Sequence, residues 1–355
     1  MVAVDFFCGA GGLTRGLMNA GINVTLGIDI KKEFRETYEG NNFPVKYLCA
    51  DIRQLEPIDV LRMLPSVPKT QLLLAGCAPC QPFTKQRREY NREKDNTLLT
   101  QFGRFVAALR PGQIVIENVP GIKKVDGFSA YRRFCKLLEN LGYFVSEGII
   151  DAKDYGVPQT RRRFVMIGAL DFKPTLPEPT YGSGRLPFET VRRAISGYPS
   201  IKAGEEHPQI PNHRSAALSP INLRRIRHTP KDGGCRFSWP HKLRLDCHKN
   251  GYAGHTDVYG RMWWDRPAPA LTCRFEYLST GRYGHPAQLR AISLREGARL
   301  QSFSDKFIFF GSSLASLATQ IGNAVPVKFG EALGRHILAM RRDACSNRTI
   351  RSQNL

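Results

Sequence analysis

The sequence predicts an α/β protein with a doubly wound, mostly parallel sheet and a smaller, irregular second domain. In the first half of the chain, short apolar runs alternate with longer amphipathic stretches. That alternation is typical of a parallel sheet covered by helices. A glycine-rich turn follows the first apolar run, and a proline-rich stretch at 171–187 interrupts the pattern. The interruption indicates a domain boundary.

The expected strands are short apolar runs, each bounded by polar, glycine or proline residues. They cover residues 2–7, 24–28, 45–48, 72–75 and 114–116, with further strands at 143–150 and 164–167. After residue 294 the pattern becomes helical again. We expect an amphipathic helix at 327–340, followed by a polar tail that frays after Arg341.

Two domains are expected, because 355 residues exceed what one minimal core requires. The larger is predicted to cover 1–178 and to be completed by 315–343, and the smaller to cover 179–314. Segment 185–262 of the smaller domain carries fourteen Lys and Arg against six Asp and Glu, with six of the eight histidines. Such a segment makes a poor regular core and a good irregular surface for nucleic acid.

The net charge of the chain is +21 and its pI is about 9.8. Such an excess attracts polyanions at long range, so nucleic acid is the expected partner, with a merely solvated basic surface as the alternative. No apolar run approaches the roughly 20 residues that span a bilayer, so we expect no membrane residence. The N-terminal segment lacks the features of an export signal, which favours a cytoplasmic protein whose nine cysteines are reduced.

A glycine-rich turn after the first expected strand suggests a nucleotide-like ligand. Phe7, Gly9 and Gly11 lie in this turn, where glycine lets the backbone approach a ligand closely. Asp29 lies about 20 residues downstream, where a carboxylate can accept both hydroxyls of a ribose. This geometry serves NAD and S-adenosylmethionine alike. The full dinucleotide fingerprint would need glycine at position 14, which is Thr14, and a tight turn without any ligand stays open.

Asp51 and Ile52 follow the third expected strand. Asp51 is placed to bind the amino group of an adenine. On its own, however, an aspartate at such a position is more often a turn or helix-cap residue, so both interpretations stay open.

Cys80 lies on a loop after the fourth expected strand, where a thiol can be exposed and its pKa tuned. Cys77 and Cys80 also form a C-x-x-C pair, which raises redox and zinc alternatives. Pro82 and the polar residues after it favour an extended loop over the helix of a thioredoxin-like pair. A structural zinc site needs a second pair of ligands with matching spacing, and a zinc deaminase needs H-x-E with P-C-x-x-C. Neither pattern occurs in the sequence.

Several segments together resemble the cytosine-C5 DNA methyltransferase family, in order along nearly the whole chain. The matching segments, besides the glycine turn, are Pro79-Cys80-Gln81, Glu117-Asn118-Val119, Gln159-Thr160-Arg161-Arg162-Arg163, residues 265–272 and Gly322-Asn323-Ala324-Val325-Pro326. The resemblance implies a DNA-modifying enzyme of the bacterial type that uses S-adenosylmethionine and no metal. It also implies a target-recognition region at about 185–262.

The resemblance assigns roles to four catalytic residues. The Cys80 thiolate would add to C6 of a cytosine flipped out of double-stranded DNA, which activates C5 for methylation. Glu117 would hold N3 and the exocyclic amine, and Arg163 would bind the O2 side and help organise the Cys80 loop. Arg161 would clamp that loop or a DNA phosphate.

The resemblance also implies the ligand contacts. The expected cofactor residues are Phe7, Gly9, Gly11, Asp29, Ile30, Asp51, Ile52, Pro79 and Asn323. The expected DNA contacts are Arg87, Arg88, Arg224, Arg225, Arg227, Arg236 and Arg244. The chain departs from the family pattern at Phe6, Asp29 and Ile30, where Leu, Glu and a larger apolar residue are commoner. These departures bear on the tightness of cofactor contacts and remove no reactive group.

Three alternatives differ in what they explain. A tRNA-methylating member of the same family shares the nucleophile, but the basic insert favours DNA. An NAD-dependent oxidoreductase is compatible with Asp29 and leaves Cys80, Glu117 and Arg163 unexplained. A non-enzymatic DNA-binding module explains the charge alone. We therefore expect an enzyme that acts as a monomer on DNA, with companion restriction or defence proteins as further partners.

Overall fold

The computed structural model describes residues 1–78, 92–123, 128–248 and 255–353. The chain divides into two compact units. Unit 1 comprises Met1–Asp151, Arg162–Pro179 and Val327–Leu355, and unit 2 comprises Ala152–Arg161 and Thr180–Pro326.

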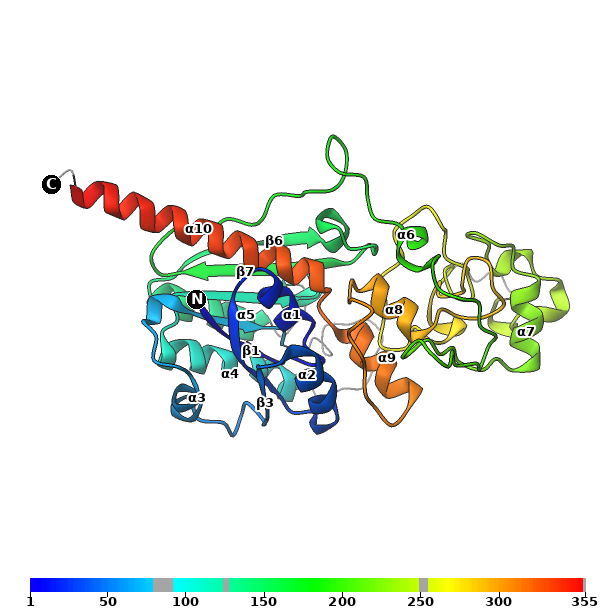
Figure 1. Ribbon diagram of the computed structural model, residues 1–355, viewed down its shortest axis with the longest axis horizontal. Helices are drawn as coiled ribbons and strands as arrows, with labels where there is room; N and C mark the ends of the chain where they lie inside the picture. The colour runs from blue at the N-terminus through cyan, green and yellow to red at the C-terminus, as the bar shows by residue number, and fades with distance from the viewer. Residues whose placement is uncertain (79–91, 124–127, 249–254, 354–355) are drawn as a thin grey trace. The chain divides into compact units, whose positions relative to one another are not determined.

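Unit 1 is built on a seven-stranded sheet in the order β3-β2-β1-β4-β5-β7-β6 (Figure 1). Its strands are β1 (Val2–Phe6), β2 (Asn23–Asp29), β3 (Lys46–Cys49), β4 (Leu72–Gly76), β5 (Gln113–Asn118), β6 (Phe144–Asp151) and β7 (Arg162–Ala169). β1 to β5 are parallel, whereas β7 runs antiparallel to β5 and β6. The predicted strands and the mostly parallel sheet are therefore confirmed.

The strand order reverses direction between β1 and β4, which are direct neighbours in the sheet. In doubly wound sheets this switch point opens a crevice at the carboxyl ends of the two strands, and ligands bind there. Phe6, the last residue of β1, pairs in register with Gly76, the last residue of β4. The glycine turn and the segment leading to Cys80 thus begin side by side.

Helices cover both faces of the sheet. They are α1 (Gly12–Asn19), α2 (Arg35–Asn42), α3 (Pro57–Met63), α4 (Arg92–Leu109), α5 (Phe128–Asn140) and α10 (Val327–Gln353). Phe6 of β1 packs edge-on against Phe102 of α4, with 5.4 Å between the ring centroids. On α1, a Cβ atom at Gly16 would meet the carbonyl oxygen of Val327 at 2.5 Å, so close packing of α1 against α10 requires glycine there (Figure 1).

The C-terminal helix is longer than predicted. It runs to Gln353 instead of ending near Met340, so the expectation of a frayed tail after Arg341 is wrong. The extension contains no proline or glycine that would end a helix. His336 and Thr175 hydrogen-bond 3.1 Å apart, which joins the helix to the segment after β7.

The unit boundaries also differ from the predicted domains. Residues 315–326, expected to complete the larger domain, belong to unit 2, and so does the 152–161 segment. The helix at 314–323 packs against the helix at 294–300, and that packing between segments adjacent in sequence decides where it belongs.

Unit 2 contains few regular elements but has a well-packed core. Its helices are short: α6 (Val191–Ile195), α7 (Pro220–Arg227), α8 (Leu294–Leu300) and α9 (Leu314–Asn323). A buried apolar cluster gathers around Trp239, Tyr259 and Ile226. Segment 185–262 has few regular elements, as expected, and this irregular chain nevertheless supplies most of that buried cluster.

Buried arginines link the loops of unit 2. Arg261 is 1% exposed and donates hydrogen bonds to four main-chain carbonyls, among them those of Thr229 and Ile226. In a sheet, main-chain carbonyls accept hydrogen bonds from the N–H groups of neighbouring strands, and loops lack these donors. A guanidinium with five N–H donors can bind several such carbonyls at once.

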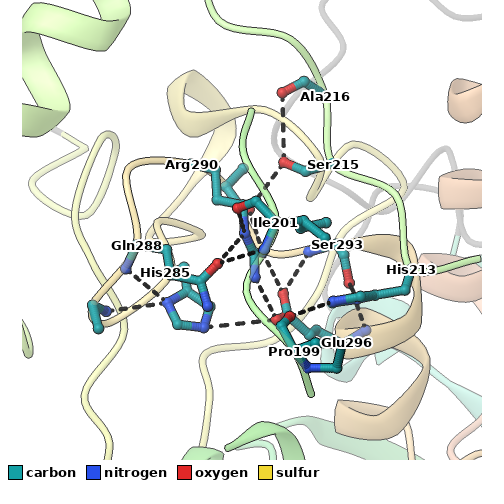
Figure 2. Close-up of polar contacts among 12 residues, drawn as sticks. Pro199, Ile201, His213, Ser215, Ala216, His285, Gln288, Arg290, Ser293 and Glu296 are labelled. Atoms are coloured by element: carbon teal, nitrogen blue, oxygen red, sulfur yellow. Dashed lines mark hydrogen bonds and ion pairs between the residues drawn. The ribbon is translucent and has the colours of Figure 1, made fainter. Parts of the chain in front are cut away.

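A second buried network surrounds Glu296 on α8 (Figure 2). Arg290 donates two hydrogen bonds to the Glu296 carboxylate, at 2.6 and 2.7 Å. Ser293 caps the helix, and its hydroxyl also lies 2.9 Å from Nδ1 of His213. Burial raises the pKa of Glu296, but the hydrogen bonds and charge of Arg290 outweigh it and lower the pKa to about 2. The carboxylate therefore stays ionised inside the unit.

Candidate active site

The glycine turn after β1 has a left-handed backbone. φ is +59° at Phe7, +54° at Gly9 and +91° at Gly11. A Cβ atom at Gly11 would collide with the side-chain amide of Asn42, whereas one at Gly9 would meet no atom of the described residues within 4 Å. The turn is thus packed on the Gly11 side and open at Gly9, which leaves room for a ligand beside the backbone.

Asp29 at the end of β2 ties this turn to the second strand. Its Oδ2 accepts a hydrogen bond from the amide of Gly9, and its Oδ1 accepts one from the amide of Lys31, both at 2.9 Å. Burial raises the pKa of the carboxyl above its ordinary value. Ile30, the next residue, is 55% exposed. A carboxylate beside an exposed apolar side chain is suited to the ribose and the adenine of a nucleoside.

The side chains of Asp51 and Ile52 contact other parts of the protein and are not arranged as those of Asp29 and Ile30 are. The carboxylate of Asp51 accepts hydrogen bonds from the Arg53 guanidinium, at 2.9 Å from Nε, and from the Arg53 amide. Those hydrogen bonds and the Arg53 charge lower its pKa. This is the geometry of a turn residue, the alternative that the sequence left open. The Ile52 side chain packs in the core of unit 1 and presents no surface to a ligand.

A buried polar network behind the turn was not predicted. The Thr14 hydroxyl donates to Asp5 Oδ2 at 2.7 Å and lies 2.8 Å from the Tyr38 hydroxyl. Burial raises the Asp5 pKa to about 7, although Thr14 opposes the shift. Thr14 stands where a dinucleotide fingerprint has glycine, and that departure was the one available signal. Its partners lie on β1 and α2, which sequence spacing does not relate.

Glu117 at the end of β5 and Arg163 on β7 form an ion pair. Arg163 Nε lies 2.8 Å from Glu117 Oε1, and the two side chains are 14% and 9% exposed. The pair follows from strand register. Val165 lies opposite Glu117 in the antiparallel β5–β7 ladder, and Arg163, two residues from Val165, points to the same face of the sheet. The structure thus brings together two residues that are far apart in the chain.

The segment leading to Cys80 is fixed at the same edge of the sheet. Burial, together with the negative charge of Glu117, raises the pKa of the Cys77 thiol well above the ordinary range. Asn118 Nδ2 donates to the carbonyl of Ala78 at 3.1 Å. A thiol held protonated in this way is unsuited to redox exchange. Pro79, Cys80, Arg87 and Arg88 lie outside the described residues.

Comparison with known proteins decides the family. The model of the family described as C-5 cytosine-specific DNA methylase matches residues 1–339. The chain belongs to this family. It is therefore a DNA cytosine-C5 methyltransferase, and the family favours this activity over the tRNA-directed alternative.

Relatives and solved structures agree over nearly the full length. The methylase is 36% identical over 338 residues to the Type II methylase M.HgiDII of Herpetosiphon aurantiacus, covering 94% of each chain. It is 32% identical to the Type II methyltransferase M1.HphI of Haemophilus parahaemolyticus, covering 95% of this chain and 86% of that one. A prophage-encoded DNA modification methyltransferase from E. coli shares its fold, with TM-score 0.71, 21% identity and 96% and 99% coverage.

Arg161 of the methylase lies within unit 2 and not with the ion pair. It is 4% exposed. Its guanidinium donates to the carbonyls of Leu271 at 2.8 Å, Gly322 at 3.0 Å and Ala324 at 3.3 Å. It therefore clamps two segments of unit 2, which differs from the predicted contact with the Cys80 loop or a phosphate. Asn323, between two of those carbonyls, is exposed.

The arginines predicted to contact DNA fall into two groups. Arg224, Arg227 and Arg244 are exposed. Arg225 instead donates to the Leu243 carbonyl at 2.9 Å, and Arg236 is 3% exposed. Their guanidinium groups serve the interior of unit 2, so the structure does not favour these two as DNA contacts.

The described residues include no group of three or more His, Cys, Asp or Glu side chains placed to hold a metal ion. Among the same residues, no helix has the length and apolar character that crossing a membrane requires.

Proposed function

We propose that the methylase uses S-adenosylmethionine, with the methyl donor bound at the glycine turn and Asp29. The open space at Gly9, the Asp29 carboxylate and the exposed Ile30 support this placement. When bound, the sulfonium supplies an electrophilic methyl group. Asp29 would accept the ribose hydroxyls, and Ile30 would contact the adenine. Asn323 stays a prediction for this site.

We infer that Cys80 is the nucleophile, with Glu117 and Arg163 as its partners. The carrying observation is the Glu117–Arg163 ion pair beside the end of β4, where Ala78 leads into Pro79 and Cys80. The Cys80 thiolate would form a bond to C6 of a flipped cytosine while Glu117 holds N3 and the amine. After the methyl group joins C5, a base takes the C5 proton and the electron pair expels Cys80.

The experiment is covalent trapping on duplex DNA that carries 5-fluorocytosine at a mapped target site. Because fluorine cannot leave as a proton does, the wild-type enzyme should remain bonded to the DNA. Cys80→Ala should form no adduct. The control is Cys77→Ser, which replaces the other thiol of the C-x-x-C pair and should still form the adduct. An adduct with Cys80→Ala, or none with wild type, would reject this mechanism.

We further propose that the methylase is the modification enzyme of a Type II restriction-modification system and acts as a monomer on double-stranded DNA. Its relatives are named Type II methylases. Within unit 2, segment 185–262 is proposed to read the target. Exchanging this segment for that of a relative with a known target should transfer the methylated sequence, as mapped by methylation-sensitive sequencing. An active chimera that keeps its original target would contradict the assignment.

A further inference from the structure

Phe237 is an exposed aromatic side chain within the basic segment of unit 2. Its exposed fraction is 56%. The other large hydrophobic side chains described as exposed in this unit are Leu186 and Leu289, and neither is aromatic. A single exposed apolar side chain is common and indicates nothing alone. The informative feature is how firmly this one is held.

Two buried anchors fix the turn that carries Phe237. Arg236 is 3% exposed, and its guanidinium carbon lies 5.0 Å from the centre of the Phe237 ring. Trp239 is 2% exposed, and its Nε1 donates to Thr229 Oγ1 at 2.8 Å. Between them, Ser238 Oγ donates to the carbonyl of His228 at 2.9 Å. The ring is thus ordered before any partner binds, which lowers the entropic cost of a contact.

The stretch of chain that carries the ring is strongly cationic. Residues 224–244 contain seven Lys and Arg and one Asp. Those whose side chains are exposed are Arg224, Arg227, Lys231, Lys242 and Arg244. The centre of a protein–protein contact is depleted in charge. An aromatic ring in such a cationic stretch instead fits a nucleic acid, in which the ring can insert at a base step that it unstacks while the cations contact phosphates.

We propose that Phe237 inserts at an unstacked base step of the bound duplex and stacks there on a nucleobase. Arg236 covers one face of the ring, and the opposite face takes the base. The surrounding cations contact phosphates, and Phe237 adds an uncharged contact to the bases. This inference rests on the proposed role of segment 185–262 in target reading.

The test measures binding of the full-length enzyme to a duplex that contains the site methylated by wild type, between about 50 and 200 mM salt. Phe237→Ala should weaken binding roughly 10-fold or more at every salt concentration. The slope against log salt should not change, because no charge is removed. Phe237→Trp should restore affinity and Phe237→Leu only part of it. Phe144→Ala is the matched control, since Phe144 is 45% exposed on β6 and also has a cation, Lys173, over its ring.

Three results would overturn the proposal. One is Phe237→Ala binding within about twofold of wild type, a difference well below that of a lost stacking contact. Another is full restoration of DNA affinity by Phe237→Leu, which would mean that the side chain at 237 only provides an apolar cover for Arg236. A third is a set of Phe237 variants in which DNA affinity falls only where the Tm falls and recovers only where the Tm recovers. Wild-type methylation would remain intact in each case, whereas an enzyme that methylates no DNA would contradict the proposed function itself.

Discussion

Arg163 Nε lies 2.8 Å from Glu117 Oε1, and both side chains are largely withdrawn from solvent. The pair joins β5 to β7. A carboxylate held in an ion pair between two paired strands is oriented before substrate arrives.

Glu117→Gln should lower kcat at least about 100-fold, because the amide lacks the charge that stabilises the protonated cytosine adduct. Binding of S-adenosylhomocysteine should persist. The control is Glu139→Gln, which breaks an exposed ion pair with Lys136 and should leave methyl transfer unchanged. The measurement is single-turnover methyl transfer, and more than a tenth of wild-type rate in Glu117→Gln would contradict the assigned role.

Asp29→Ala should weaken S-adenosylhomocysteine binding by about 1–3 kcal/mol, since ribose hydroxyls and the Gly9 amide would lose their acceptor. The affinity of Asp29→Asn for S-adenosylhomocysteine should lie between those of wild type and Asp29→Ala, because asparagine keeps one carbonyl oxygen. Calorimetric titration measures the affinities, with NAD as a ligand that should not bind. Asp59→Ala removes an exposed carboxylate on α3 and should bind normally. Normal binding by Asp29→Ala would place the methyl donor elsewhere.

Asp5 predicts a pH-dependent stability. Its folded-state pKa of about 7 exceeds the ordinary 3.8 because the carboxyl is buried. The folded state therefore holds a proton that the unfolded state loses, and this stabilisation is present below about pH 4 and lost as pH rises to about 7.

Asp5→Asn mimics the protonated form and does not titrate. Relative to wild type, its free energy of unfolding should rise across that window, by up to about 4 kcal/mol. Chemical denaturation at several pH values, with Asp59→Asn as control, measures the difference. A difference that does not vary with pH would mean that Asp5 is ionised in the fold.

Arg225 and Arg227, two residues apart on α7, should behave oppositely. Arg225 lies over the rings of Trp239 and Tyr259 and donates to Leu243, so Arg225→Ala should cost about 1–3 kcal/mol of stability. Arg227→Ala should change stability by less than about 0.5 kcal/mol. It should instead weaken DNA binding and reduce the salt slope by about 1. Thermal denaturation and salt-dependent DNA titration distinguish them, and equal Tm losses would contradict the division.

Much of the fold could be read from local patterns. The strands of unit 1 are continuous apolar runs, such as 72–75, because a parallel sheet buries both faces. The turn at Gly9 and Gly11 needed no tertiary information either, because a left-handed backbone favours glycine. Cys80, Glu117 and Arg163 were predicted as catalytic residues through motifs that resemble those of a known family.

The roles of individual arginines could not be read in this way. Arg225 and Arg227 occur in the same basic run, yet Arg225 is half-buried against aromatic rings and Arg227 is exposed. Arg161 lies two residues from Arg163, yet it clamps Leu271 and Gly322 inside unit 2. Each assignment depends on a partner far away in sequence.

The sequence by itself determined the order of the strands along the chain and the glycine turn, because these depend on local backbone geometry, and its motifs predict the reactive residues. The tertiary structure alone decided which cations face solvent, that Thr14 joins Asp5 to Tyr38, and that α9 belongs to unit 2. A buried polar group is stabilised by the partners that the fold brings to it, and those partners have no fixed spacing in the sequence.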